Sequence, residues 1–285
     1  ASDVYKRQSL RITLRYILGN LHCLGDAERL HISEMQEIER WVLHRITELD
    51  KMLREACNNF EFHSLFNELH SFCTVDLSAF YFDIRKDSLY CDRVDAIKRR
   101  AVRTILDELF KCLTAWLATF ICFTAEEAWL TRFPGEDESV HLRLFPEIPV
   151  NWRNDALAEK WRNIRNFRRV VTGALEVERA EKRIGSSLQA HPIVYTSKTY
   201  IDEMADLDCA EIVITSDITL VDDPAPLNAF VLEDVGDVGV VSEIAKGNKC
   251  VRCYRVLPEV GTISGHEMTC GRCADAVAEY LALSE

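Results

Sequence analysis

The chain has 285 residues, of which 48% are hydrophobic and 28% charged, and this composition favours a folded protein of more than one domain. It holds no run of about 18 apolar residues, and its first residues lack the apolar core of a signal peptide. We therefore expect neither a membrane span nor secretion. The net charge of −12 argues against a general nucleic-acid binder.

The acidity is concentrated in one segment of the chain. Residues 186–245 carry one basic and 12 acidic residues, whereas residues 1–185 carry 28 basic and 29 acidic ones. Residues 246–285 carry five of each. Both ends of the chain can therefore bind an anion locally.

Long helices are predicted over about the first 130 residues. Ser33–Phe60 and Arg93–Phe120 place apolar side chains at steps of three and four, and Ala27–Phe133 contains no Gly or Pro. Ser33 and Thr124 are each followed three residues later by Gln or Glu, which is typical of a capping box that starts a helix. This pattern predicts a helical bundle.

A mixed segment follows the bundle. Three prolines and a glycine mark Arg132–Pro149 as a surface connection, and Asn154–Gly185 is again predicted to be helical. Short strands are predicted beyond it at "HPIVYT", "AEIVITS" and "VGVVSEI", with a turn at Asp222–Asn228. A last helix is predicted over "ADAVAEYLALSE". We divide the chain into a bundle (1–150), a long helix with a small α/β junction (151–245) and a cysteine-rich end (246–285), mainly α overall.

Two Cys-x-x-Cys pairs, Cys250 with Cys253 and Cys270 with Cys273, are separated by sixteen residues. Four thiolates in two tight turns match tetrahedral Zn²⁺, and they leave no coordination position open, so we expect one structural zinc ion. His266 lies between the pairs, but a fifth ligand is not needed. Two disulfides, a redox dithiol and an iron–sulfur site are the alternatives. Seven further cysteines are scattered singly, which is typical of reduced thiols and a cytoplasmic protein.

Two other features bear on RNA. Arg252 and Tyr254 lie in the first cysteine turn, where a guanidinium and a ring suit an unstacked base, although an ordinary surface would look the same. Basic residues cluster in "RVDAIKRRAVR" and "KWRNIRNFRR", either as solvated helix faces with ion pairs or as a surface that follows phosphates. The chain has no P-loop, G-x-G-x-x-G or G-x-S-x-G motif, which argues against an active enzyme within these residues.

Several stretches together resemble the C-terminal part of bacterial isoleucyl-tRNA synthetases. They are "LRITLRYILGNLHCL", "YFDIRKDSLYCD", "FTAEEAWL", "VTGALEVERAEKRIGSSLQA" and the closing "KCVRCYRV…TCGRC", in the order of that family. The resemblance implies a helical anticodon-binding bundle, a small α/β junction and a C-terminal four-cysteine zinc ribbon. The catalytic and editing regions, which would use ATP to attach isoleucine to its tRNA, have no counterpart here.

The resemblance also implies individual roles. Cys250, Cys253, Cys270 and Cys273 match the zinc ligands, and Arg252, Tyr254, Arg11 and Arg15 match positions that face the isoleucine tRNA anticodon stem-loop. Tyr254 stands where Trp is usual. "ASDVYKRQ" at the start does not fit the family pattern. We expect a monomer that binds this tRNA without activating isoleucine. The alternatives are a stand-alone tRNA-binding paralogue and a zinc-ribbon interaction protein without catalysis.

Overall fold

The computed structural model describes residues 2–284 and divides them into two compact units. The first unit ends at Asp155 and leaves out Cys91–Arg93, which belong to the second unit together with Ala156 and everything after it. The first boundary lies close to the predicted one at 150. The further division at 245 stays a prediction. Within residues 2–284, no helix combines the length and the apolar character needed to cross a bilayer.

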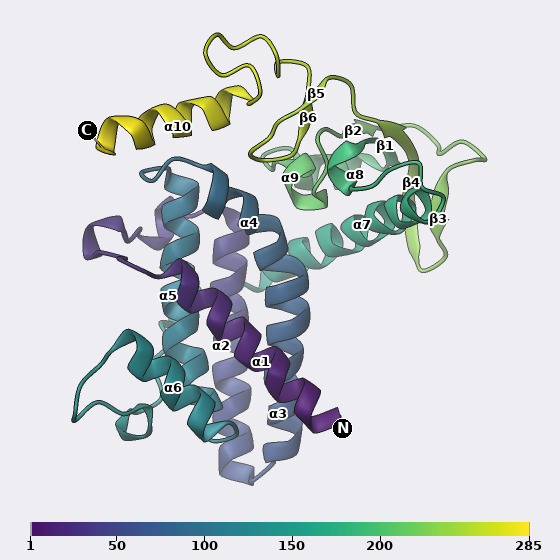
Figure 1. Cartoon of the computed structure of the whole chain (residues 1–285). Coiled ribbons are helices and arrows are strands. Elements are labelled where there is room, and N and C mark those ends of the chain that lie inside the picture. The colour runs from purple at the N-terminus through teal and green to yellow at the C-terminus, as the bar shows by residue number, and fades with distance from the viewer. Residues whose placement is uncertain (1, 285) are drawn as a thin grey trace. The chain divides into compact units, whose positions relative to one another are not determined.

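The first unit is the predicted helical bundle. Helices α2, α3 and α5 lie side by side, and α1 crosses them obliquely (Figure 1). The α-helices are α1 (Ser2–Asn20), α2 (Glu37–Asn59), α3 (Phe62–Ser71), α4 (Phe82–Cys91), α5 (Ile97–Leu117) and α6 (Cys122–Arg132), with a π-helical stretch η3 (Phe72–Tyr81) between α3 and α4. Three-residue 3₁₀ turns, η1 (Asp26–Glu28), η2 (Ile32–Glu34), η4 (Val140–Leu142) and η5 (Val150–Trp152), fill the connections.

The apolar periodicity places the core residues of the bundle correctly. Trp41, Ile46 and Leu49 of α2 and Leu113 and Trp116 of α5 are all almost fully buried. Each fully buried side chain of this size stabilises the fold by roughly 1.5–3 kcal/mol. The predicted stripe of apolar residues is therefore the surface along which the helices pack.

Both predicted capping boxes are wrong. Ser33 lies inside η2, where its hydroxyl contacts the ring of His31, and α2 begins only at Glu37 without a side-chain cap. Thr124 lies inside α6, which begins two residues earlier at Cys122. Near Ser33 the capping box forms two residues earlier, where His31 and Glu34 cap η2. A cap that contributes about 1 kcal/mol does not by itself determine where a longer helix begins.

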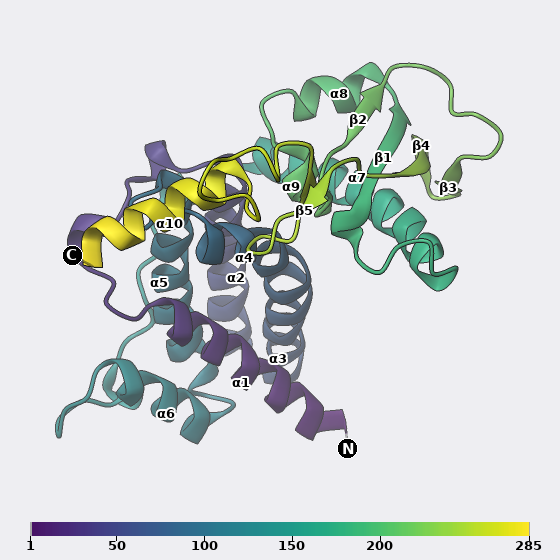
Figure 2. The same ribbon diagram turned by 45° about the horizontal axis from the view of Figure 1, so that its top comes forward.

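The second unit joins a long helix to a small mixed sheet. Helix α7 (Asp155–Ala180) ends five residues before the predicted Gly185. The strands are β1 (Ala190–Thr196), β2 (Thr219–Val221), β3 (Phe230–Leu232) and β4 (Val235–Ile244), in the order β2-β1-β4-β3. β2 runs parallel to β1, while β4 is antiparallel to both β1 and β3. Figure 2 shows this sheet from a second direction.

Helix α7 packs closely on this sheet. An added Cβ at Gly173 would lie 3.0 Å from the ring of Phe230 in β3, so a larger residue at this position would require that ring to shift. Short helices α8 (Lys198–Met204) and α9 (Cys209–Val213) and a 3₁₀ turn η6 (Ser187–Gln189) complete this part.

One predicted strand, "AEIVITS", is wrong, because residues 209–213 form α9. Asp208 caps this helix by accepting a hydrogen bond from the backbone N–H of Glu211, and Ile214 ends it in the left-handed conformation. A local cap thus overrides the β-branched composition of the segment. The strands predicted at "HPIVYT" and "VGVVSEI" are confirmed as β1 and β4.

The cysteine-rich end has little regular structure. A two-stranded ribbon, β5 (Asn248–Lys249) with β6 (Val256–Leu257), encloses the first cysteine pair, and α10 (Gly271–Ser284) confirms the predicted last helix. The buried residues of this end are the four cysteines and three small apolar residues, Val260, Ala274 and Ala276. Because so small an apolar cluster rarely stabilises a fold alone, this end needs another source of stability.

Candidate metal centre and nucleic-acid interface

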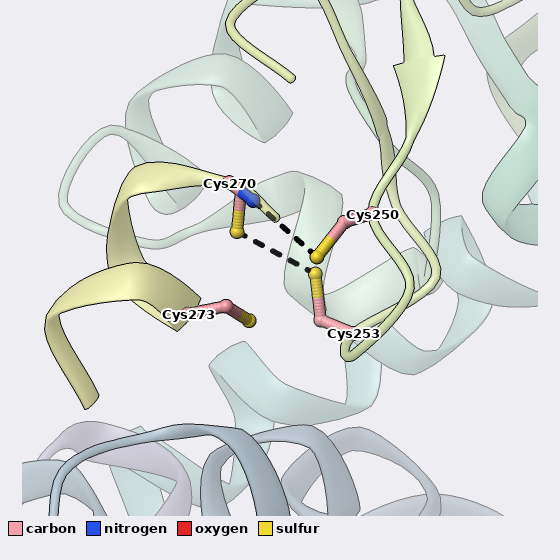
Figure 3. Close-up of side chains that lie close together, drawn as sticks. All are labelled: Cys250, Cys253, Cys270 and Cys273. Carbon is pink, nitrogen blue, oxygen red and sulfur yellow. Dashed lines mark hydrogen bonds between the residues drawn. The ribbon is translucent and has the colours of Figure 1, made fainter. Parts of the chain in front are cut away.

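The structure brings the four predicted cysteines together. Their Sγ atoms all lie within 4.8 Å of one another, and all four residues are buried. Cys250 and Cys253 come from the turn between β5 and β6, and Cys270 and Cys273 from the start of α10, with the sulfur atoms directed toward one another (Figure 3). This spatial cluster is a candidate metal centre.

The geometry fits a tetrahedral ion. Sulfur atoms about 2.3 Å from a central metal would be separated by roughly 3.8 Å along each edge of the tetrahedron. The Sγ atoms of Cys253 and Cys270 are 3.7 Å apart. All eleven cysteines lie in the described residues and are free thiols, so the alternative of two disulfides is not what the structure shows. The cluster can hold one metal ion.

Backbone hydrogen bonds favour ionisation of one thiol of the cluster, Cys250. Burial opposes ionisation of Cys250, but backbone N–H groups of Cys253, Cys270 and Arg252 point at its sulfur and lower its pKa to about 6. The Cys270 N–H donates to this sulfur over 3.4 Å. The Cys253 and Cys270 thiols have raised pKa values, through a hydrogen bond with Cys273 and through burial, respectively. The Cys250 thiolate is therefore favoured even without a metal ion, whose positive charge would favour thiolates further.

The first cysteine turn presents a tyrosine outward. The Tyr254 backbone N–H donates to the Cys250 carbonyl over 3.0 Å, which closes the turn and holds Tyr254 at a φ of +65°. The ring is left 54% exposed, and the Lys249 Nζ lies 4.9 Å from its centroid. Sequence reasoning missed Lys249, although it directly precedes the first cysteine. An exposed ring beside a cation suits a nucleic-acid base and its phosphate.

The two arginines of this turn, Arg252 and Arg255, both donate hydrogen bonds to main-chain carbonyls. Arg252 is half-buried, and its Nη1 donates to the main-chain carbonyl of Cys91. Arg255 donates to the Ser216 carbonyl over 2.6 Å. The role of Arg252 in RNA binding stays a prediction.

Helix α1 carries the other two predicted contact residues. Arg11 is exposed but makes a double hydrogen bond with the Glu127 carboxylate, both at 3.0 Å. Arg15, one turn later, is exposed, and we find no ion-pair partner for it among the described residues. Of the two, Arg15 is the better placed for an added anion.

Most of the two basic runs serve the fold. Arg99 donates to the Leu89 and Val94 carbonyls, Arg100 to those of Ala27 and Glu28, and Arg103 to those of Asn20 and His22. In the second run, Arg162 pairs with Glu159, Arg169 with Asp234, and Arg168 bonds the Ile212 carbonyl. These contacts favour the interpretation as paired structural residues over a surface that follows phosphates.

Residues 39–194 match the family model described as the anticodon-binding domain of tRNA ligase. The match covers more than half of the chain and most of the bundle. The chain belongs to this family. The four cysteines, Arg11 and Arg15 lie outside the matched stretch of the anticodon-binding domain.

The similarity to curated relatives extends beyond the anticodon-binding domain to nearly the whole chain. Isoleucine–tRNA ligases of Agrobacterium fabrum and Ruegeria pomeroyi are 47% and 48% identical over 282 and 278 residues, which are 99% and 97% of this chain. That of Mesorhizobium japonicum is 49% identical over 263 residues, or 91%. The chain spans only 29%, 28% and 26% of these relatives and matches their C-terminal part.

These matches correct one expectation about the start of the anticodon-binding chain. "ASDVYKRQ" amounts to about 3% of the sequence, whereas the Agrobacterium match covers 99% of it, so the similarity extends into these residues. Helix α1 begins among them, at Ser2. Ala1 lies outside the described residues.

Proposed function

We propose that the chain is the anticodon-recognition part of an isoleucine–tRNA ligase, a cytoplasmic, monomeric module that binds isoleucine tRNA. One observation carries the proposal. A metal-competent cluster of four thiols closes a turn that exposes Tyr254, in a chain that matches the C-terminal part of isoleucine–tRNA ligases over nearly its whole length. Aromatic rings on rigid turns are what proteins use to stack splayed-out bases of single-stranded RNA loops.

Zinc is the ion that we assign to the cluster. Four thiolates at tetrahedral spacing suit Zn²⁺, which would hold the two cysteine turns together through Cys250, Cys253, Cys270 and Cys273. With all four positions filled by protein, the ion would have a structural role. An iron–sulfur centre, the other occupant of such a site, would colour the protein, whereas zinc leaves it colourless.

The whole ligase would attach isoleucine to its tRNA with ATP, a chemistry for which these residues carry no recognisable motif. The test is binding of purified, zinc-loaded chain to isoleucine tRNA and to an unrelated tRNA in gel shifts at low and moderate salt. We expect preferential binding of isoleucine tRNA and no ATP–pyrophosphate exchange. Equal binding of both tRNAs, or of neither, would instead support a zinc-ribbon interaction protein.

A further inference from the structure

A fifth cysteine lies in the same buried cluster as the four candidate metal ligands. Cys91–Arg93, here called the strap, belongs to the same compact unit as the four cysteines, although its neighbours in the chain on both sides do not. Cys91 is 7% exposed and packs in one buried cluster with Cys250, Cys253, Cys270 and Cys273. The cluster therefore contains five thiols, one more than a tetrahedral site uses.

Arg252 holds the backbone of the strap. Its Nη1 donates to the Cys91 carbonyl, and in return the Cys91 Sγ donates to the Arg252 carbonyl over 3.7 Å. Arg252 lies between the ligands Cys250 and Cys253, so its position depends directly on the first cysteine turn. This reciprocal contact connects the strap to the first half of the metal site.

Ion pairs connect the strap to the second half. Arg272, between the ligands Cys270 and Cys273, donates to the Asp92 carboxylate over 3.1 Å, and that carboxylate is 10% exposed. Arg93 pairs with Asp275 and Glu279 of α10, each at 3.1 Å. All three strap residues thus contact groups whose positions depend on a ligand pair.

We propose that the strap is an outer layer of the metal centre, which closes when the ion orders both cysteine turns and slows release of the ion. In this arrangement Arg252 is a positioning residue: it affects RNA binding by holding the strap and the Tyr254 turn, not by contacting a base. The part that concerns RNA rests on the function proposed above. Groups that hold metal ligands from outside typically change metal affinity by about 10- to 100-fold.

Zinc release tests the strap directly. Zinc-loaded full chain is mixed with a chromogenic chelator, and the rate of transfer is compared for wild type, Asp92→Asn, Arg93→Ala and Arg252→Ala. We expect about tenfold faster release from each variant. Arg162→Ala, which removes an exposed ion pair elsewhere in the unit, should release zinc at the wild-type rate. Asp92→Asn removes the charge but keeps the shape of the side chain, so faster release from this variant cannot be attributed to misfolding. Unchanged release from Asp92→Asn, Arg93→Ala and Arg252→Ala overturns the proposal.

Alkylation gives a second measurement, with controls inside the same chain. Cys23 and Cys122 are exposed and report full reactivity, whereas Cys91 is buried. In zinc-loaded wild type, peptide mapping should show Cys91 protected from iodoacetamide, and chelation should remove the protection. In zinc-loaded Arg252→Ala, Cys91 should react while the four ligands stay protected. Reaction of Cys91 as fast as Cys23 in loaded wild type would refute a closed strap.

RNA binding separates positioning from direct contact. If Arg252 acts through the strap, Asp92→Asn and Arg252→Ala both weaken tRNA binding, and Arg252→Lys restores part of it by donating to the same carbonyl. Loss of tRNA binding in Arg252→Ala alone, with normal zinc release, assigns Arg252 to base contact and overturns the positioning role. If wild type binds no tRNA, the proposed function fails, while the release and alkylation results still decide on the strap.

Discussion

Tyr254 combines local backbone strain with an exposed side chain. A non-glycine residue at a φ of +65° costs roughly 1–2 kcal/mol, and here the cysteine turn imposes that conformation. The same turn directs the ring outward. A ring on a turn that a bound metal would hold rigid would lose little conformational entropy when a base stacks on it, which suits recognition of an RNA loop.

We predict that Tyr254→Ala weakens binding of isoleucine tRNA by about 5- to 150-fold, because stacking of one base is worth about 1–3 kcal/mol. Tyr254→Phe should keep most of the affinity and Tyr254→Trp should at least match wild type, since a larger ring stacks better. Filter binding measures the dissociation constants. Tyr280→Ala, which removes an exposed ring elsewhere in the unit, is the matched control. Equal affinity of Tyr254→Ala and wild type would contradict the stacking role.

At the scale of elements, one buried carboxylate connects several parts of the bundle. Asp107 of α5 is fully buried and pairs with Arg29 after η1, Arg132 at the end of α6 and Lys111 one turn along. Burial alone would raise the pKa of Asp107, but hydrogen bonds from Arg29 and Lys111 and the charges of Lys111 and Arg132 outweigh it. The pKa of this carboxyl therefore lies below its ordinary value.

We predict that Asp107→Asn lowers the free energy of unfolding of the bundle by about 1.5–3 kcal/mol at neutral pH, because it leaves partly buried cations without their counter-charge. Since the pKa of Asp107 is lower in the folded state, its contribution is complete above about pH 4 and is lost as the pH falls further. The difference between wild type and variant in urea unfolding should therefore shrink below about pH 4. A pH-independent difference would contradict this electrostatic account.

Features that depend on the spacing of residues along the chain could be predicted from the sequence, whereas contacts between distant residues could not. Helix periodicity and the two Cys-x-x-Cys pairs are local patterns, so the bundle core and the four clustered cysteines could be predicted. The predicted capping boxes at Ser33 and Thr124 do not mark the beginnings of α2 and α6, which lie at Glu37 and Cys122 without side-chain caps. The strap has no local signal either, because Cys91 and Arg252 are 161 positions apart.

At the scale of the whole molecule, the described residues form two compact units, and the four-cysteine cluster lies in the second of them. The end that holds the four cysteines buries little besides those cysteines. Its fold should therefore depend on the metal, whereas the bundle is stabilised by its own apolar helices.

We predict that wild type binds one zinc ion per chain and that Cys250→Ser binds none. In this variant residues 246–285 should unfold and become sensitive to proteolysis, while the helical circular dichroism of the bundle persists. Elemental analysis and limited proteolysis with mass mapping measure both effects. Loss of the whole helical signal would show that the two units unfold as one.

Electrostatics also acts at the scale of the whole molecule. Because most arginines of the two basic runs already bond carbonyls or carboxylates, few cations can displace counterions from RNA. Each new phosphate contact steepens the plot of log binding constant against log salt concentration by about 0.7–0.9.

Arg15 and Arg11 make a matched pair for this test, since both lie on one helix and both are exposed, but only Arg11 already pairs with a carboxylate. We predict that Arg15→Gln reduces the slope for isoleucine tRNA by about 0.7–0.9, the value of one lost phosphate contact. Arg11→Gln should reduce it less, because Arg11 must first give up Glu127, and Glu127→Gln should strengthen binding by releasing Arg11. Binding isotherms at four or more salt concentrations give the slopes. Equal slopes for wild type and Arg15→Gln would place the tRNA away from this face of α1.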